Sequence, residues 1–320
     1  MVAPWLQRVP SPTIVAMSST LTATASPPRQ GLGTLVIACL AATWLIWGST
    51  YLAIKFALPS FPPFLQMGSR FITAGVLLMA WMRLARRAPW PTPAQWRNAF
   101  IVGTLMLGGG MGGTAYAEQS VGSGLVVAFI AIVPVLMVAL NAALGSHPSK
   151  SELAGIAVGV GGVLLLTQGA GFRASPVGLA AIATACVTWC VGSVMSQRRF
   201  TLAPGAVGFA SEMICGGLVL MLLAGFDGEY AKQAALWPPQ STAVVAWLYL
   251  VVAGSLIAFN AYMLLLAKAS PALASSYCFV NPVIAMMLGI TLGGETITGF
   301  EWLAAAVVVS GVVLLLRGKG

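Results

Sequence analysis

Long apolar runs separated by short polar segments dominate this chain. Each run has roughly the 18–22 residues that an α-helix needs to cross the hydrocarbon core of a bilayer. The runs do not alternate apolar and polar residues, as the strands of a membrane β-barrel do. A helix also satisfies all its backbone hydrogen bonds internally, which lipid requires. The pattern therefore predicts ten transmembrane helices, over residues 33–56, 64–82, 99–117, 122–144, 152–168, 176–196, 207–225, 242–266, 272–292 and 300–317.

Composition supports a membrane protein. Hydrophobic residues make up 58% of the chain and charged residues 7%, whereas a typical soluble domain is about 25% charged. So few charges cannot cover a water-facing surface, so lipid is the expected solvent. The net charge of +9 does not indicate a nucleic-acid partner, because the basic residues lie in short clusters between apolar runs and not on one hydrophilic face.

The first 32 residues differ from the rest. They are rich in Ser, Thr and Pro, a composition typical of a disordered tail. No continuous apolar segment follows Arg8, so the layout of a signal peptide is missing. Residues 1–32 are therefore predicted to be a disordered N-terminal tail, within which Met17 could be the true start.

The distribution of basic residues orients the bundle, because cytoplasmic loops carry an excess of Lys and Arg. With the N-terminus inside, the outside segments hold only Arg173 and Lys232. Both termini are therefore predicted to be cytoplasmic. The cytoplasmic segments then hold Arg8, Arg29, Arg83, Arg86, Arg87, Arg97, Lys150, Arg198, Arg199, Lys268, Arg317 and Lys319.

The two halves of the chain resemble each other. Matching positions recur at nearly constant shifts of 142 to 149 residues, and the pairs are Arg70 with Glu212, Gly75 with Gly217, Pro134 with Pro282, Glu152 with Glu301, and Gly162 with Gly311. Five spans per copy is an odd number, so the second copy must be inverted in the membrane. Inverted repeats are a recurrent transporter design. The predicted fold is all-α, with two inverted five-helix repeats over residues 33–168 and 176–317.

Several segments also resemble a known family, the EamA-type members of the drug/metabolite transporter superfamily. The likeness covers about 33–317 and is strongest to the YedA-like inner-membrane exporter branch. It implies a ten-helix inverted-repeat fold and export of small organic metabolites, amino acids or drugs across a bacterial inner membrane, without naming the substrate. The segments that carry it are TWLIWGSTY over 43–51, NAY over 260–262, SPALA over 270–274, NPV over 281–283, GGET over 293–296 and EWL over 301–303.

Ionisable groups at membrane depth are the first candidates for a site, because burying one is costly unless it is paired. Arg70 lies about seven residues, roughly 10 Å, into its span, and Glu212 is its repeat counterpart. Arg70 could hold an anionic group of the solute, and Glu212 a cation or a coupling proton. Alternatively, each pins neighbouring helices. Inversion places them in opposite halves of the membrane, so a direct salt bridge is expected only near the midplane.

Two prolines, Pro134 and Pro282, stand mid-span at equivalent positions. Each removes a backbone hydrogen bond and is predicted to kink its helix. Asn281 could bind a ligand beside such a kink, whereas its counterpart Val133 could not. Helix shaping without ligand contact is the alternative.

Aromatic and amide side chains supply further candidates for a lining suited to organic solutes. Trp47 and Tyr51 are four residues apart and share a helix face. Tyr116 and Tyr262 stand at repeat-related ends of their spans, and Asn260 lies two residues before Tyr262. An interfacial aromatic belt is the alternative.

The remaining signals point away from catalysis. Cys186 and Cys190 lie four apart without a His or carboxylate, so neither a metal nor another cofactor is expected. There is no Gly-x-x-x-x-Gly-Lys-Ser/Thr loop for ATP, so transport must be downhill or ion-coupled. Gly155-x-x-x-Gly159 could support a homodimer, though weakly. Glu118 is expected to be solvated. The predicted function is an alternating-access exporter with no catalytic residue; a lipid-acting membrane enzyme and a passive channel are the alternatives.

Overall fold

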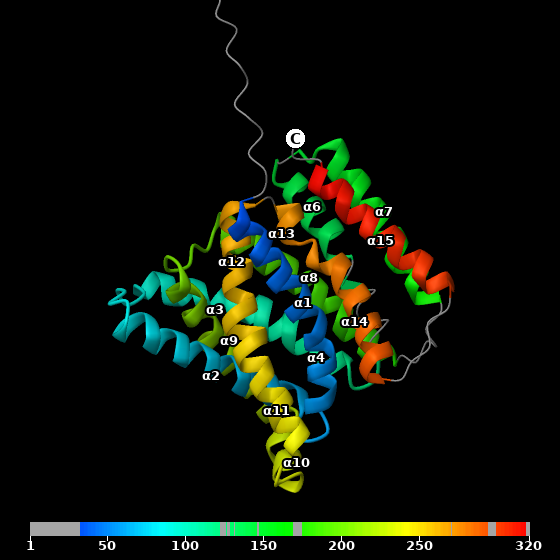
Figure 1. Cartoon of the computed structure of the whole chain (residues 1–320). Coiled ribbons are helices and arrows are strands. Elements are labelled where there is room, and N and C mark those ends of the chain that lie inside the picture. Colours follow the sequence, from blue (N-terminus) through cyan, green and yellow to red (C-terminus); the bar gives the residue numbers. More distant parts are fainter. Residues whose placement is uncertain are drawn as a thin grey trace, which may run out of the picture. The chain divides into compact units, whose positions relative to one another are not determined.

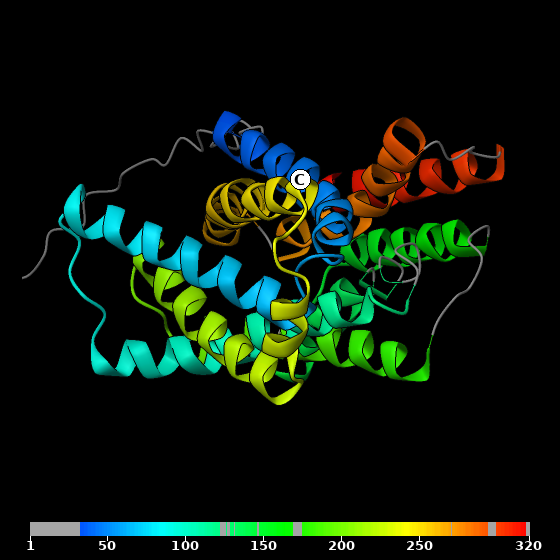
Figure 2. The same cartoon turned by 90° about the horizontal axis from the view of Figure 1, so that it is seen from below.

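The computed structural model describes residues 33–121, 126, 129–130, 132–145, 147–168, 175–269, 271–293 and 299–317. The predicted tail over 1–32, part of the predicted span over 122–144, and Arg173 and Lys319 lie outside these residues. All regular elements in the described part are helices (Figures 1 and 2).

The first half contains two long helices, α1 (Thr34–Ala57) and α2 (Pro63–Leu84), followed by a helical rod of three segments. The rod consists of α3 (Pro93–Gly103), the π-helical turn η1 (Thr104–Gly112) and α4 (Gly113–Ala117). The last elements of this half are α6 (Val133–Ala143) and α7 (Lys150–Gln168).

The second half begins with α8 (Pro176–Arg198) and α9 (Ala206–Phe226), and the short α10 (Glu229–Ala235) follows. A second rod combines α11 (Ser241–Tyr249), the π-helical turn η2 (Leu250–Ile257) and α12 (Ala258–Lys268). The half ends with α13 (Pro271–Ala274), α14 (Tyr277–Gly293) and α15 (Gly299–Arg317).

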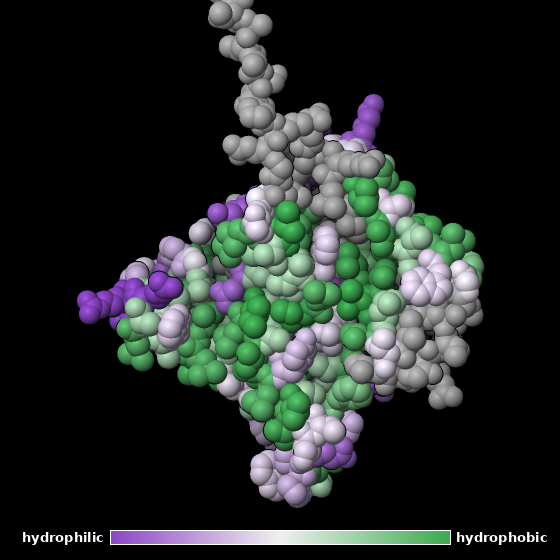
Figure 3. Space-filling view, viewed as in Figure 1, coloured by the Kyte–Doolittle hydropathy of each residue, from purple (hydrophilic) through white to green (hydrophobic). Residues whose placement is uncertain are grey.

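Five helical stretches are long and apolar enough to cross a membrane: Thr34–Ala57, Pro63–Leu84, Pro176–Arg198, Ala206–Phe226 and Ser241–Tyr262. Two shorter apolar helices occur over Val133–Ala143 and Trp302–Gly311. Figure 3 shows hydrophobic residues across the middle of the visible face, whereas hydrophilic residues gather at the α2–α3 connection and near α10. The chain is therefore a helical integral membrane protein.

Local sequence explains where several helices begin. Proline occupies the first helical position of α2, α3 and α8, where its missing N–H removes no helical hydrogen bond. Thr92 caps α3: its Oγ1 accepts from the backbone N–H of Gln95 at 3.3 Å, and Gln95 Oε1 accepts from the N–H of Thr92 at 2.8 Å. Ser175 Oγ accepts from the N–H of Gly178 at 3.0 Å and caps α8 in the same way.

Helices α2 and α9 pack closely through glycines. A Cβ atom at Gly75 would lie 2.9 Å from the carbonyl oxygen of Ala210. A Cβ at Gly217 would lie 3.0 Å from the carbonyl oxygen of Gly68. The two backbones can approach this closely only because these positions lack side chains.

The α7–α15 pair is built in the same way (Figure 1). A Cβ at Gly162 would lie 2.6 Å from the backbone nitrogen of Val308, and one at Gly311 would lie 2.6 Å from the nitrogen of Gly159 and 3.0 Å from the carbonyl oxygen of Gly155. The Gly155–Gly159 face, considered above for a homodimer, thus packs against α15 within the same chain.

Candidate functional site

An aromatic cluster surrounds Trp47 in the middle of α1. Its ring lies 4.7 Å from that of Tyr277, 5.1 Å from those of Phe259 and Tyr262, and 6.3 Å from that of Trp189, measured between centroids. Most of these pairs have the edge-to-face geometry that aromatic rings prefer. The cluster joins α1 to α8, α12 and α14.

The π-helical turn η2 supplies the polar partner of Trp47. The indole Nε1–H donates to the carbonyl oxygen of Gly254 at 3.2 Å. π-Helical turns shift the backbone hydrogen-bonding register and often occur at functional sites. The turn therefore fixes the orientation of the indole by presenting a carbonyl group toward α1.

A cavity of about 60 Å³ lies beside this cluster. That volume holds a few water molecules and is well below the roughly 300 Å³ of the smallest ligand pockets. The described residues that line it include no charged side chain; among them are Trp47, Tyr51, Thr114, Cys186, Trp189 and Asn281. We call this space the Trp47 cavity.

Asn281 is a buried polar group of the cavity wall. The residue is 0% exposed, and neither Oδ1 nor Nδ2 has a hydrogen-bond partner in the described part of the chain. In contrast, the hydroxyl groups of Thr50 and Thr114 donate to the carbonyl oxygens of Trp47 and Gly110 at 2.7 and 2.8 Å. A buried amide that makes no close hydrogen bond is costly. The Tyr51 side chain lies within reach of a longer polar contact with it, so Asn281 and Tyr51 together can bind a ligand that enters the cavity.

Arg70 is fully buried but does not line this cavity. Its Nε–H donates to Ser255 Oγ at 2.8 Å, and Nη1 contacts Met67 Sδ at 3.6 Å. Its Nη2 has no hydrogen-bond partner among the described residues. A Cβ at Gly254 would lie 2.8 Å from this Nη2, so the guanidinium packs directly against η2.

Glu212 is 2% exposed, and its Oε1 has no partner in the described part of the chain. It does not line the Trp47 cavity. Among the described residues the only ion pair is Lys232–Asp227, so Arg70 and Glu212 do not form a salt bridge in this conformation.

The other predicted site residues lie at different places. Tyr262 belongs to the aromatic cluster, 5.7 Å from the ring of Tyr277. Asn260 donates to the carbonyl oxygen of Leu256 in its own rod. Tyr116 stacks on Phe64 at 5.4 Å, away from the cavity.

Of the two predicted helix kinks, Pro134 is buried in the first turn of α6, directly after a turn at Ile132. Pro282 lies within α14. Cys190 donates to the carbonyl oxygen of Val133 at 3.6 Å, and Cys186 to that of Phe129 at 3.4 Å. The two thiols thus bind backbone near the start of α6, and the described residues contain no cluster suited to a metal ion.

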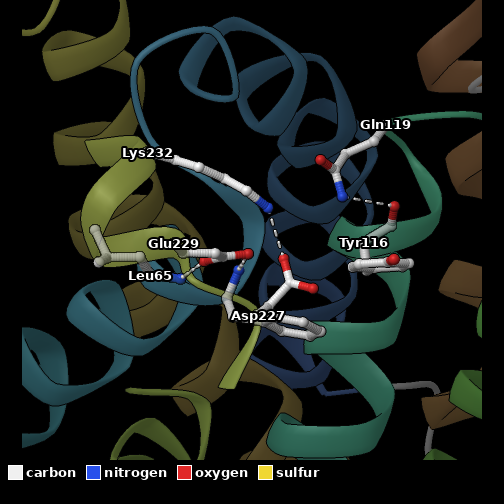
Figure 4. A network of polar contacts seen from close by, with 7 residues as sticks. Leu65, Tyr116, Gln119, Asp227, Glu229 and Lys232 are labelled. Atoms are coloured by element: carbon white, nitrogen blue, oxygen red, sulfur yellow. Dashed lines mark hydrogen bonds and ion pairs between the residues drawn. The ribbon is translucent and has the colours of Figure 1, made fainter. Parts of the chain in front are cut away.

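One end of the bundle consists of residues 57–63, 117–121 and 227–240, and we call it the α10 end. A polar network at this end was not predicted from the sequence (Figure 4). The buried carboxylate of Glu229 accepts from the backbone N–H groups of Phe64 and Leu65 at 3.2 and 2.7 Å. It caps the N-terminus of α2, where negative charge is favoured. Burial raises the pKa of Glu229, and these two donors partly offset that effect.

Comparison with known proteins assigns the family. The model of the EamA-like transporter family matches residues 34–168 and 176–317. The chain is 41% identical to the uncharacterized inner membrane transporter YedA of Escherichia coli (strain K12), over 88% of this chain and 90% of that protein. It is 25% identical to protein PecM of Dickeya dadantii, over 84% and 88% of the two chains.

Two more distant proteins are also similar to this chain over most of its length. A "Probable amino-acid metabolite efflux pump" of Salmonella typhimurium is 23% identical, over 86% of this chain and 92% of that protein. A protein of known crystal structure, also 23% identical, superposes with a TM-score of 0.69 over 87% of this chain and 95% of that chain, so the two share a fold. The chain belongs to the EamA-like transporter family, as a multi-pass inner-membrane transporter and not an enzyme.

Proposed function

We propose that this transporter exports small organic solutes by alternating access, and that the Trp47 cavity is its solute site. The observation that carries the proposal is Asn281, a buried amide that makes no close hydrogen bond in the described part of the chain, in a cavity walled by Trp47, Tyr51 and Trp189. Sites for small molecules combine apolar and aromatic walls with a few polar groups that orient the ligand. At about 60 Å³ the cavity is smaller than such a solute, as expected for a state between the two open ones.

Alternating access requires two halves that exchange conformations, and the helix contacts support an inverted repeat. The shift of 142 residues that relates Gly75 to Gly217 also relates Gly68 to Ala210. The contact of Gly75 with Ala210 therefore becomes, on exchange of the halves, the contact of Gly217 with Gly68, and the structure contains both.

The α7–α15 pair repeats this pattern. The shift of 149 residues that relates Gly162 to Gly311 also relates Gly159 to Val308. The contacts Gly162–Val308 and Gly311–Gly159 are therefore counterparts. Reciprocal contacts of this kind are those of a twofold axis, and they support repeats over 33–168 and 176–317, ten spans and, with the positive-inside rule, two cytoplasmic termini.

The π-helical turns also occur at equivalent positions. The shift of 146 residues that relates Tyr116 to Tyr262 relates Thr104 to Leu250, the first residues of η1 and η2. η1 contributes Gly110 and Met111 to the cavity wall, and η2 binds Trp47. We expect these turns to be the places where the two rods bend as the cavity opens.

The cavity favours a solute with an aromatic or apolar body and one group that can bond an amide. Its described lining has no charged side chain, so bare ions are poor ligands. An amino-acid metabolite, the cargo in the name of the Salmonella relative, fits if its charged groups pair with each other or reach water at one end. Glu212 remains a candidate for proton coupling, because its Oε1 is buried without a partner.

The test is saturable solute uptake into inside-out vesicles, across a panel of amino acids and organic cations, with and without a pH gradient. Asn281→Ala is expected to lower transport at least tenfold, because the solute loses its orienting amide. Asn141→Ala is the matched control. The Nδ2 of this amide donates to the carbonyl oxygen of Met137, and its Oδ1 accepts from Arg198 Nη2, away from the cavity.

The proposal fails if Asn281→Ala and Asn141→Ala transport equally well. Uptake that never saturates would instead favour a channel. Glu212→Gln should abolish any pH-driven component while leaving counterflow, and unchanged pH coupling would remove Glu212 from the mechanism.

A further inference from the structure

A second hollow lies one helical turn from the Trp47 cavity, on the same faces of the same helices. Tyr51 on α1 and Thr114 on α4 line the cavity. Lys55 and Glu118, each four residues further along and hence on the same face, line a pocket of about 620 Å³ at the α10 end. The lining residues of the two spaces are thus about one helical turn, roughly 5 Å, apart along each helix, and we call the protein between the two spaces the neck.

Glu118 lies at this neck, one residue past the end of α4. The residue is half-buried, but both its carboxylate oxygens are buried and have no hydrogen-bond partner among the described residues. Other carboxylates near the helix ends have partners: Glu229 has two backbone donors, Asp227 has Lys232, and Glu152 has the N–H of Ser149. The expectation that Glu118 is solvated was therefore wrong, because neighbouring elements cover its carboxylate.

The charged and titratable groups around Glu118 leave it without a close counter-ion. Lys55 and Tyr51 face it from α1, and Lys55 attracts it without reaching ion-pair distance. Lys232 lines the same pocket from α10 but pairs with Asp227 at 2.9 Å. Tyr116 precedes it by two residues on its own helix. Burial raises the pKa of the Glu118 carboxyl well above its usual value, and Lys55 offsets only part of that rise.

We propose that Glu118 is the proton-linked gate residue between the Trp47 cavity and the α10 end. In the closed neck the carboxyl is dry and keeps its proton. When the neck opens, water reaches the carboxyl, the proton passes to that water, and the carboxylate faces Lys55 in a wet channel. Closing reverses the step, so each opening and closing exchanges one proton with the α10 side. The inference rests on the proposed function, because it assumes a cavity that opens.

The sign of the effect follows from linkage. The closed state binds the proton more tightly than the open state, so raising the pH favours opening toward the α10 end. With one linked proton, the ratio of open to closed molecules rises by up to about tenfold per pH unit between the carboxyl pKa values of the two states.

Cys186 provides a reporter, because it lines the Trp47 cavity and is 4% exposed. In a background in which the other four cysteines are replaced by alanine, the labelling rate of Cys186 is measured with a membrane-impermeant thiol reagent. The reagent is applied separately to each face of reconstituted vesicles, over a range of pH. At each pH, the labelling rate of the protein with Glu118 is divided by the rate of the Glu118→Gln variant in the same background. The ionisation of the thiol affects both rates equally, so it cancels in this ratio. Glu152→Gln, which changes a carboxylate outside both hollows, is the matched control.

The expected result is a ratio that rises several-fold per pH unit from one face only, with Glu152→Gln behaving like the parent. Lys55→Gln, which keeps Glu118, should move the rise to higher pH because a nearby cation is lost. A flat ratio, with Cys186 still labelled, overturns the gate and leaves the transport proposal standing. Cys186 that stays unlabelled from both faces at every pH overturns the accessible cavity, and with it both proposals.

Discussion

The close approach of α7 and α15 can be tested with two adjacent glycines. A Cβ at Gly162 would lie 2.6 Å from the backbone nitrogen of Val308 and 3.0 Å from its Cα, whereas a Cβ at Gly161 would meet nothing within 4 Å. Both substitutions to alanine gain the same helix propensity, about 0.5–1 kcal/mol. Only Gly162→Ala must also push two backbones apart, and overpacking of this kind costs about 1–3 kcal/mol.

The difference between Gly162→Ala and Gly161→Ala is therefore about 1–3 kcal/mol, or roughly 5- to 150-fold in the ratio of folded to unfolded protein. The assay is thermal unfolding in detergent, followed with a thiol-reactive dye, because all five cysteines are buried in the folded chain. Gly162→Ala should unfold below the wild type, and Gly161→Ala at or above it. Equal midpoints for the two variants would refute the close packing of α7 on α15, and with it one of the two reciprocal contacts that support the repeat.

Three further changes test the polar contacts. Ser255→Ala should lower stability by about 1–3 kcal/mol in the same unfolding assay, because it leaves a buried N–H of Arg70 without an acceptor; no loss would mean that water replaces the hydroxyl. Glu229→Gln should speed amide hydrogen exchange at Phe64 and Leu65, because the wild-type carboxylate accepts from both N–H groups and glutamine has neither its charge nor its second acceptor oxygen. Unchanged exchange would contradict the cap. Asn281→Leu should raise the unfolding midpoint while lowering transport, because it removes an unpartnered amide that the solute needs; a lower midpoint would show that the amide is satisfied within the protein.

The helical membrane fold was predictable because a bilayer can be crossed only by a long apolar segment, and such a segment must be helical to satisfy its backbone hydrogen bonds. α2 begins at Pro63, within one residue of the predicted span, since proline marks the first turn. The π-helical turns were not predictable. η1 overlaps a glycine-rich stretch over 108–113, but composition does not distinguish a π-helical register from a regular one, and η2 has no such stretch.

The site was harder to predict, because the sequence gives the position of a residue along a span but not the neighbouring helix toward which its side chain points. Trp47 and Tyr51 share a helix face and both line the cavity. Arg70 lies in α2, within the predicted span, but nothing in the sequence of this helix indicates that its side chain turns toward η2. Glu118 stands past the end of a span, where solvation is the usual expectation, yet its carboxylate oxygens are buried, and the residues around it include Lys55 and Lys232 from distant parts of the chain.

Backbone symmetry and side-chain asymmetry together indicate where the chemistry lies. The glycine contacts and the π-helical turns occur in both halves, as the proposed exchange of conformations between the halves requires. Arg70 binds Ser255, but the counterpart of Ser255 under the 146-residue shift is Gly109, which has no hydroxyl to offer Glu212. Asn281 and its counterpart Val133 both line the cavity, yet only the asparagine can bond a solute. A symmetric frame that carries its amide in one half only favours a single orientation of the solute, and under the proposed alternating access that orientation is preserved when the halves exchange conformations.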